Sequence, residues 1–420
     1  MPKVVVLGAG FAGLSAASEL LRLRKRVRDL DVIVVDRNNF MTFTPLLPEA
    51  ATGSIEMRAV TQPLRALLAG ARVELGDVVA LDETARTMSA RHPITQVVTT
   101  IGYDELILAL GSTPSTMGIE GVERATLPLR TVADAQRLRS ALVGAIEVAT
   151  ETKDLVERDR LLRFVVVGGG FTGVEVAGEI TAFLRSILRF YPALQAHPPS
   201  VGLLQGEQRL LPHLPEHFGT YAARVLRQRG VDVRTGAKVR SVDPAGLTLE
   251  SGERFDSRTI LWDVGNEPAP FVKRLGLPLS KDGAIETARD CSVVGHAHLW
   301  AIGDCAAIPQ DGGKTYAPLA QNATREGPLV ARNVIARLRG ERTKAFRYRM
   351  LGQMASLGNR TAVAELPGGV MLKGLLAWLL WHAYYLGRVP SGARRTRVAV
   401  DWTIDLMQPR SPVRLPERIA

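Results

Sequence analysis

At 420 residues the chain is long for a single hydrophobic core, so two or three domains are expected. Hydrophobic residues make up 46% of it, but no apolar run reaches the roughly 18–20 residues of a membrane-spanning helix. The formal net charge is +11, and residues 341–420 hold thirteen Lys or Arg against five acidic residues; no nucleic-acid-binding motif accompanies this charge, so nucleic acid is not expected as a partner.

The N-terminal residues do not have the pattern of a secretory signal, because Lys3 is the only early charge and the apolar residues after it belong to a strand. A cytoplasmic location is therefore expected. The two cysteines, Cys291 and Cys305, are too far apart for a C-x-x-C redox pair. The seven histidines show no metal-ligand spacing, so no metal site is expected.

The first predicted element is a buried strand over residues 4–7, followed at once by a glycine-rich turn. Gly8, Gly10 and Gly13 have the spacing G-x-G-x-x-G. In this pattern the glycines allow a tight turn, a close backbone approach to a pyrophosphate, and close packing of the following helix. The phosphate then lies at the helix N-terminus, where free N–H groups and the helix dipole favour an anion.

The next strand, over residues 32–35, ends at Asp36. An acid at this place commonly accepts hydrogen bonds from the ribose hydroxyls of an adenosine, although an ordinary acid in the loop after a strand stays an alternative. Residues 102–111 are predicted to form a strand that ends in Gly111, where the chain can approach a cofactor closely. Residues 114–160 are interpreted as a hinge, a short helix and a charged connection.

A second glycine turn follows the apolar run 164–167, with Gly168, Gly170 and Gly173 at the same spacing. We expect its helix to continue through Glu179 to about Arg189, a loop over 191–200 and a strand over 201–204. Two ordinary glycine-rich turns remain the alternative, but two copies with the same flanks favour two bound dinucleotides. The alternation of strands and helices predicts an α/β fold with parallel sheets and two Rossmann-like dinucleotide-binding domains.

The strand over 201–204 ends in Gln205 rather than in an acid, and Arg209 follows shortly after. A carboxylate at this position favours NADH over NADPH, because it repels the 2′-phosphate. NADH is the first choice for the second turn, and NADPH stays open.

Residues 299–304 repeat the pattern of a strand followed by glycine, which places Asp304 where it can bind a cofactor hydroxyl. A helix is expected to begin near Ala317 and to point its N-terminus at the same cofactor.

The apolar segment 374–386 is predicted to be a helix of about 20 Å, too short to cross a bilayer. Its aromatic residues and the arginines after it favour a helix lying in the membrane interface, and a buried core helix is the alternative. The aromatic residues are Trp378, Trp381, Tyr384 and Tyr385, and the arginines are Arg388, Arg394, Arg395 and Arg397. The pattern of 398–407 fits a strand or a helix equally, and the Pro- and Arg-rich tail after it is expected to be loose.

Several of these segments together resemble the type II NADH:quinone oxidoreductases, a family of single-chain flavoproteins. The resemblance covers nearly the whole chain. The segments that carry it are 44–53, 103–112, 168–179, 302–304, 320–321 and 374–381.

The resemblance implies FAD in the first turn, NADH in the second, and a membrane quinone as electron acceptor. The residues expected to hold FAD are Gly8, Gly10, Phe11, Ala12, Gly13, Asp36, Arg37, Val79, Ala109, Gly111, Gly303, Asp304, Ala320 and Gln321. Those expected to hold NADH are Gly168, Gly170, Phe171, Thr172, Gly173, Glu175, Gln205, Gly265 and Asn266.

Three residues are the candidates for catalysis by this resemblance. Glu175 is expected near the flavin and nicotinamide, where it relays a proton or orients the nicotinamide, with a glutamate on the helix face that forms a salt bridge as the alternative. Gln321 and Arg325 are expected at the quinone, although Arg325 stands where many family members have Gln.

The implied domains are a split FAD-binding domain of residues 1–115 and 272–340, an inserted NAD(P)H-binding domain of 116–271, and a C-terminal membrane-anchoring region of 341–420. The implied enzyme is an NADH dehydrogenase that pumps no protons. It would be a homodimer bound peripherally to an anionic membrane surface, on the cytoplasmic side, through its C-terminal segment. A sulfide:quinone oxidoreductase, a flavin-bound redox sensor that binds a partner protein, and a reductase for a soluble electron carrier remain alternatives.

Overall fold

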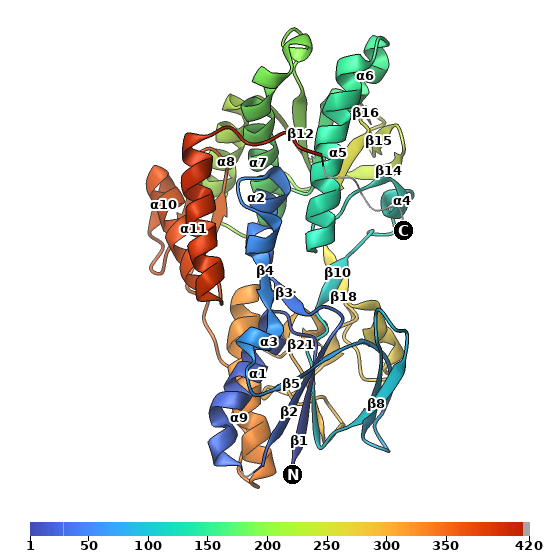
Figure 1. Ribbon diagram of the computed structural model, residues 1–420, viewed down its shortest axis with the longest axis vertical. Helices are drawn as coiled ribbons and strands as arrows, with labels where there is room; N and C mark the ends of the chain where they lie inside the picture. Colours follow the sequence, from blue (N-terminus) through green and yellow to red (C-terminus); the bar gives the residue numbers. More distant parts are fainter. Residues whose placement is uncertain (28, 415–420) are drawn as a thin grey trace. The chain divides into compact units, whose positions relative to one another are not determined.

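The computed structural model describes residues 1–27 and 29–414, which form two compact units (Figure 1). The first unit contains Met1–Thr42, Gln62–Thr113 and Asn266–Met350. The second contains Phe43–Thr61, Pro114–Gly265 and the chain from Leu351 onward. Each unit is built around a parallel sheet with helices, which confirms the predicted α/β class.

The sheet of the first unit is parallel throughout, with strand order β20-β9-β1-β2-β5. Its strands are β1 (Lys3–Leu7), β2 (Asp31–Asp36), β5 (Arg72–Leu75), β9 (Glu105–Leu108) and β20 (Leu299–Ala301). Residues 4–7 are completely buried, because a central strand of a parallel sheet is covered on both faces. The predicted strands at 4–7 and 32–35 are therefore confirmed.

Two long helices of the first unit, α1 (Phe11–Leu23) and α9 (Ala320–Leu338), lie side by side (Figure 1). Gly327 makes this contact possible, because a Cβ there would lie 2.5 Å from the main-chain oxygen of Ala12. The predicted helix near Ala317 begins at Ala320, after Pro318. This unit also contains β3 (Phe40–Thr42) and the short helix α3 (Leu64–Leu67). A separate antiparallel sheet contains β6 (Asp77–Asp82), β7 (Thr87–Arg91) and β8 (Val98–Gly102). Three short strands are β18 (Asn266–Pro268), β19 (Ile285–Glu286) and β21 (Ala306–Ala307).

The sheet of the second unit is also parallel, with strand order β13-β12-β11-β17. Its strands are β11 (Arg163–Val167), β12 (Ser200–Gln205), β13 (Val231–Thr235) and β17 (Thr259–Trp262). Helix α7 (Phe171–Ile187) follows β11, as predicted, and α8 (Glu216–Gln228) precedes β13. A separate antiparallel sheet of this unit contains β14 (Val239–Asp243), β15 (Gly246–Leu249) and β16 (Arg254–Asp256). Two further short strands, β4 (Thr61–Pro63) and β10 (Ser112–Pro114), lie where the chain passes from one unit to the other.

The interpretation of residues 114–160 as a hinge with one short helix is wrong. This stretch contains α4 (Val122–Ala125), the 20-residue α5 (Val132–Glu151) and α6 (Leu155–Leu162). Helix α5 begins with a capping box, in which Thr131 and Asp134 each bind the other's backbone N–H. Its buried stripe packs on α2 (Leu47–Thr52) and on β17.

The C-terminal part of the second unit joins an antiparallel sheet to two helices. The sheet contains β22 (Gln353–Ser356), β23 (Ala362–Glu365) and β24 (Met371–Gly374), and the helices are α10 (Leu375–Arg388) and α11 (Gly392–Met407) (Figure 1). Residues 398–407 are therefore helical. Only Ala377 and Trp381 of α10 are buried, so α10 is not the core helix of the alternative interpretation. Within the described residues, no helix has the length and apolar character needed to span a bilayer.

Candidate functional site

The first glycine turn joins β1 to α1 and has the geometry of an anion cradle. Gly8 has φ +90°, and a Cβ on Gly13 would lie 1.8 Å from the Gly8 main-chain oxygen. A Cβ on Gly10 would instead meet open space. Gly10 caps α1 without any side-chain hydrogen bond, and the N-terminus of a helix favours an anion. The structure therefore fits a pyrophosphate at Gly8, Gly10, Phe11, Ala12 and Gly13.

Asp36 ends β2 beside this turn. Its two carboxylate oxygens accept hydrogen bonds from the N–H groups of Ala9 (2.7 Å) and Asn38 (2.8 Å). Burial raises the pKa of Asp36, while these two bonds lower it. Each oxygen keeps a lone pair for a ribose hydroxyl. The neighbouring Arg37 side chain is exposed and directed to Asp77, 3.9 Å away.

The other predicted FAD residues of the first unit follow the ends of strands or begin a helix. Ala109 and Gly111 follow β9, and a Cβ on Gly8 would lie 2.3 Å from the Ala109 main-chain oxygen. Gly303 and Asp304 follow β20, and the Ser112 hydroxyl donates to Asp304 Oδ2 at 2.6 Å. Val79 lies apart from these, in β6 of the antiparallel sheet.

The beginning of α9 carries Ala320 and the predicted quinone residues. Gln321 Oε1 accepts a hydrogen bond from the Tyr348 hydroxyl at 3.1 Å. The guanidinium carbon of Arg325 lies 5.7 Å from the centre of the Tyr348 ring. Tyr348 thus connects Gln321 with Arg325, and no sequence pattern had singled it out. A further residue missed is Glu326, which accepts from the Gly303 N–H and whose pKa burial raises to about 7.

The second glycine turn joins β11 to α7 and repeats the first one closely. Gly168 has φ +111°, a Cβ on Gly173 would lie 1.8 Å from the Gly168 oxygen, and a Cβ on Gly170 would meet open space. Gly170 caps α7 without a side-chain hydrogen bond. Phe171 and Thr172 follow in the first turn of α7. This site fits a second pyrophosphate.

Gln205 takes the place that Asp36 has in the first unit. It is buried at the end of β12, and its Oε1 accepts from the Gly169 N–H at 2.8 Å. Its amide nitrogen is a donor and not an acceptor. The last two residues predicted to bind NADH are Gly265 and Asn266. The boundary between the two units passes between them, so Gly265 belongs to the second unit and Asn266 to the first unit.

Asp263 is a half-buried acid beside the second turn that sequence analysis missed. It follows β17, and a Cβ on Gly168 would lie 2.3 Å from its main-chain oxygen. Burial raises its pKa to about 7, while hydrogen bonds from the Gly173 N–H and the Thr172 hydroxyl lower it. The sequence signal that could have identified Asp263 is its position directly after an apolar strand.

Glu175 lies one turn into α7 and is buried, and its carboxylate binds uncharged donors rather than the cation of the alternative salt bridge. Its Oε1 accepts from the Ser356 N–H at 3.0 Å and from the Trp381 indole at 3.1 Å. Burial raises the pKa of Glu175 to about 8, against the lowering effect of these hydrogen bonds. The carboxyl group is therefore protonated at neutral pH and can donate a proton.

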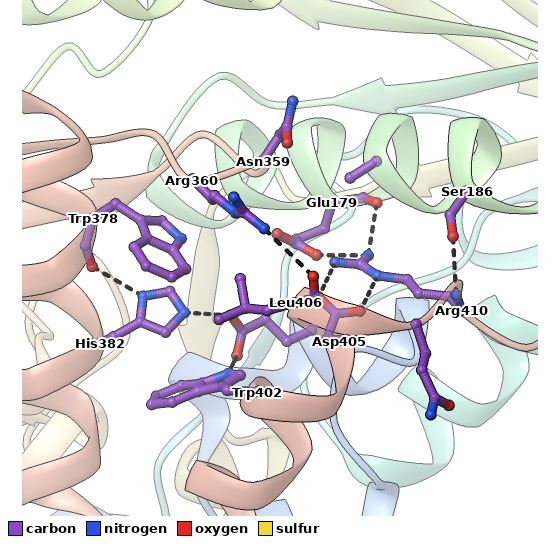
Figure 2. A pocket seen from close by; sticks show the side chains of 13 residues that line it. Glu179, Ser186, Asn359, Arg360, Trp378, His382, Trp402, Asp405, Leu406 and Arg410 are labelled. Atoms are coloured by element: carbon purple, nitrogen blue, oxygen red, sulfur yellow. Dashed lines mark hydrogen bonds and ion pairs between the residues drawn. The ribbon is translucent and has the colours of Figure 1, made fainter.

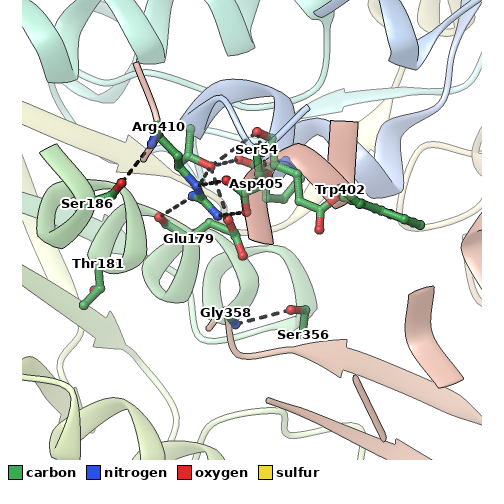
Figure 3. A network of polar contacts seen from close by, with 12 residues as sticks. Ser54, Glu179, Thr181, Ser186, Ser356, Gly358, Trp402, Asp405 and Arg410 are labelled. Atoms are coloured by element: carbon green, nitrogen blue, oxygen red, sulfur yellow. Dashed lines mark hydrogen bonds and ion pairs between the residues drawn. The ribbon is translucent and has the colours of Figure 1, made fainter. Parts of the chain in front are cut away.

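More buried polar residues surround Glu175 in the second unit than the sequence indicated. Glu49 on α2 and His382 on α10 line a cavity together with Glu179 of α7 (Figure 2). Arg410 forms ion pairs with Glu179 at 2.9 Å and with Asp405 at 2.8 Å (Figure 3).

Arg410 corrects the expectation of a loose tail for the described residues around it, while the last part of that tail, 415–420, lies outside the described residues. Its side chain is 8% exposed, its main-chain N–H donates to the Ser186 hydroxyl, and its guanidinium also donates to the Thr52 hydroxyl (Figure 3). No pattern near position 410 marks this burial, although the spacing of Glu175 and Glu179 on one helix face was visible.

Comparisons with known proteins agree with this architecture. Residues 2–327 match the family model of the pyridine nucleotide-disulphide oxidoreductases, and residues 350–411 match that of the NDH2 C-terminal domain. The chain is similar to the mitochondrial internal alternative NAD(P)H-ubiquinone oxidoreductase A1 of Arabidopsis thaliana, with 32% identity over 96% of this chain and 83% of the relative.

It is also similar to the type II NADH:quinone oxidoreductase NdhA of Mycobacterium tuberculosis, with 31% identity over 96% of this chain and 87% of that protein. Among solved structures, NDH2 from Plasmodium falciparum in complex with NADH superposes with a TM-score of 0.90. That match covers 98% of this chain and 99% of the other at 20% identity, so it concerns the fold. With this coverage and identity, the chain belongs to the type II NADH:quinone oxidoreductases, within the pyridine nucleotide-disulphide oxidoreductases.

Proposed function

We propose that this chain transfers a hydride from NADH to FAD and two electrons from FAD to a membrane quinone, without pumping protons. The observation that carries this proposal is the pair of glycine turns, each of which leads into a helix that is capped by a glycine with no side chain in the path of a phosphate. FAD, when bound, accepts the hydride and passes its electrons on. The protein positions the two nucleotides and excludes water.

The first unit is the proposed FAD site, with Asp36 for the ribose and Asp304 for a further hydroxyl. The second unit is the proposed NADH site, with the pyrophosphate at Gly168, Gly170 and Gly173. Support comes from the open space at Gly10 and Gly170, where any side chain would stand in the path of a phosphate. NADPH stays open, because Gln205 carries no charge to repel a 2′-phosphate.

Glu175 is the proposed proton donor of the second unit. A carboxyl group that is neutral at pH 7 can give a proton or donate a hydrogen bond, which an ordinary carboxylate cannot. Gln321 and Arg325 are proposed to bind the quinone carbonyls. Support comes from Tyr348, which holds Gln321 by a hydrogen bond and contacts Arg325.

The test of the function is a rapid-mixing experiment without oxygen. NADH should bleach the visible absorbance of bound FAD, and added quinone should restore it. Steady-state assays in liposomes should then compare NADH with NADPH. A protein that stays colourless after reconstitution with FAD, or a flavin that NADH does not bleach, would contradict the proposal.

The membrane contact is proposed to lie on α10 and α11. On α10, Leu375, Leu376 and Leu379 are 54%, 67% and 50% exposed, and on α11 the exposed apolar residues include Ile404 and Met407. Large apolar side chains at this exposure, followed by a cluster of arginines, suit an interfacial helix on anionic lipid.

We place this contact at the cytoplasmic face. Flotation with anionic vesicles should carry the protein upward, and flotation with neutral vesicles should do so less. Binding to neither would contradict the membrane contact. Sedimentation in detergent tests the expected homodimer.

Each of the three alternative functions requires a property or a behaviour that differs from what this proposal expects. A sulfide:quinone oxidoreductase needs a reactive thiolate, but Cys291 and Cys305 are buried, and burial raises the pKa of Cys305 to about 12. A reductase for a soluble carrier would not bind vesicles. A redox sensor would turn over slowly and keep a long-lived complex between nicotinamide and flavin.

A further inference from the structure

A cavity of about 170 Å³ lies in the second unit among α2, α7, α10 and α11 (Figure 2). Exposed residues line its outer part: Asn359, Arg360 and Gln408. The buried acids Glu49 and Glu179 line its inner part. A polar space of this size has room for several water molecules. The cavity therefore connects the solvent with two buried carboxyl groups.

Glu49 and His382 face each other across this cavity. Glu49 Oε2 accepts a hydrogen bond from the Trp402 indole at 2.9 Å, and Glu49 Oε1 lies 3.7 Å from His382 Nε2 (Figure 2). His382 Nδ1 lies 2.9 Å from the main-chain oxygen of Trp378. A carbonyl oxygen only accepts, so Nδ1 carries the hydrogen and Nε2 of the neutral ring has a free lone pair.

This geometry needs one proton between the two side chains. A carboxylate oxygen facing an imidazole lone pair would be repulsive, and a proton on either group removes the repulsion. Burial, and next the charge of Glu179, raise the pKa of Glu49 well above its usual range, and burial lowers the pKa of His382 to about 4. The shared proton therefore resides on Glu49, and the imidazole is neutral.

The charges around the pair favour its protonated form. Glu179 faces it from α7, Asp405 from α11, and Arg410 from the tail. Arg410 is one positive charge shared by two carboxylates, so that cluster keeps a net negative charge. Two further charged groups among the described residues are Arg360 at the outer part of the cavity and Arg139 of α5, which lies against Gly53.

The pair is also close to Glu175. The Trp381 indole that donates to Glu175 packs against His382, with ring centres 4.9 Å apart, and against Trp402, with centres 6.4 Å apart. Glu175 and Glu179 stand one helical turn apart on α7, so their side chains share a face. Glu179 lines the cavity, and Glu175 stands one helical turn before it on the same face of α7.

We propose that Glu49 and His382 form the proton-uptake pair of this enzyme, which takes a proton from cavity water and passes it along the α7 face towards Glu175. This inference rests on the proposed function. Quinone reduction by NADH consumes one proton, because a hydride brings one proton with its two electrons and the quinol carries two protons. One of the two hydroxyl protons of the quinol therefore corresponds to the proton that the hydride contains. The other is the proton that Glu49 and His382 deliver.

The first test needs no turnover. Infrared spectra of the holoenzyme at pH 7 should contain the carbonyl band of a protonated, buried carboxyl group that Glu49→Gln removes. Nitrogen-15 NMR of histidine-labelled protein should show one histidine that stays the neutral Nδ1–H form from pH 8 down to pH 6. Absence of either signal would overturn the proposal.

The second test compares two electron acceptors. Ferricyanide accepts electrons without protons, whereas menadione needs one proton from solution for each NADH. In Glu49→Gln the Trp402 hydrogen bond is kept, and menadione reduction at pH 8 should fall about tenfold while ferricyanide reduction changes less than twofold. At pH 6, where protons are more abundant, the loss should be smaller.

Controls separate this inference from a structural effect and from the proposed function. Asp401→Asn removes a carboxylate of α11 that does not line the cavity, and should leave both rates unchanged. His382→Gln serves if Glu49→Gln fails to fold, and should show the same split between acceptors. Equal losses with both acceptors, or no loss at pH 8, would overturn the inference. If the wild-type flavin is not reduced by NADH at all, the proposed function itself has failed.

Discussion

Helices α1 and α7 begin from nearly the same glycine turn, yet they serve different surroundings. Gly10 caps α1 at φ −70° and ψ −161°, and Gly170 caps α7 at φ −74° and ψ −164°. One turn later α1 has Ser15, whose hydroxyl bonds back to the Phe11 oxygen, where α7 has the buried Glu175.

The following turn differs in the same way. In α1 Glu19 forms ion pairs with Arg22 and Arg332, whose side chains are largely exposed, while Glu179 of α7 pairs with the buried Arg410. This difference shows that the glycine turn is a general structure for binding a phosphate. The chemistry of each site is specified by the side chains in the following turns of the helix.

The largest expected effect comes from breaking either turn. Gly13→Ala places a Cβ 1.8 Å from a backbone oxygen, so the protein should lose FAD and become colourless. Gly173→Ala makes the same clash in the second unit, and the protein should stay yellow but no longer respond to NADH. Absorbance spectra before and after NADH addition check both.

A matched pair of substitutions separates ligand loss from misfolding. A Cβ at Gly10 or Gly170 meets open space, so Gly10→Ala and Gly170→Ala should keep the melting temperature of the wild type and lose affinity for their respective nucleotides. If Gly170→Ala binds NADH as the wild type does, the second turn is not the NADH site.

The next effect concerns the carboxyl group that only α7 carries. Glu175→Gln should lower the rate of quinone reduction by about a hundredfold, the size expected for loss of a proton donor. Glu19→Gln, at the equivalent position of Glu179 in α1, should change that rate less than twofold. Steady-state kinetics with a quinone checks this, and equal effects of both substitutions would contradict the comparison.

Glu175 also predicts how stability depends on pH. Its pKa is raised from 4.5 to about 8 in the folded protein, so the folded state holds a proton that the unfolded state loses. The resulting stabilisation is complete below pH 4.5 and is lost as pH rises towards 8, at up to about 1.4 kcal/mol per pH unit. The melting temperature of Glu175→Gln should therefore fall less than that of the wild type between pH 6 and pH 9.

A smaller effect should come from Arg229 at the end of α8. Its guanidinium donates to the main-chain oxygens of Leu357 and Gly358, at 2.6 and 2.8 Å, and to the Thr361 hydroxyl at 2.6 Å. These bonds fix the turn after Ser356, whose N–H lowers the pKa of Glu175. Arg229→Gln should lower quinone reduction about tenfold and shift its alkaline pH limb upward, because the pKa of Glu175 rises.

Two variants control this prediction. Arg229→Lys keeps the charge but not the forked geometry, and should recover only part of the rate. Arg224→Met changes an exposed residue of the same helix that stacks on Tyr221, and should leave the pH profile in place. A lower rate with an unshifted profile would mean that Arg229 acts on stability alone.

The smallest effect sharpens the contrast between Asp36 and Gln205. Gln205→Glu still accepts from the Gly169 N–H and adds a negative charge, so the rate with NADPH should fall about three- to tenfold relative to the rate with NADH. Asp36→Asn in the first unit should weaken FAD retention and leave this ratio unchanged. An unchanged ratio in Gln205→Glu would show that the 2′-position of the nucleotide lies elsewhere.

The turns and strands could be predicted because their signals are local. Apolar runs followed by spaced glycines specify a strand, a turn and a helix within a short stretch of sequence. The helix expected in 114–160 was too short although Thr131 and Asp134 offered a capping-box pattern for α5, because the charged residues that follow α5 suggested an exposed connection. Local pattern also left residues 398–407 undecided, and only the contacts of α11, such as Trp402 with Glu49, select a helix.

The surroundings of Glu175 could not be predicted, because they join residues far apart in the sequence. Arg410 lies 231 residues after Glu179, and Trp381 lies 206 residues after Glu175. Nothing in the sequence near Arg410 or His382 marks a buried ionisable group. Burial of a polar side chain depends on what the rest of the chain supplies, so it appears only in the structure.

Arg410 follows all of its partners in the chain, which has a consequence during synthesis. Its partners Thr52, Glu179 and Asp405 come from α2, α7 and α11, so this cluster is completed only after residue 410 has left the ribosome. Until then the buried Glu179 has no Arg410 to pair with, while the first unit can already close its sheet from β1 to β20.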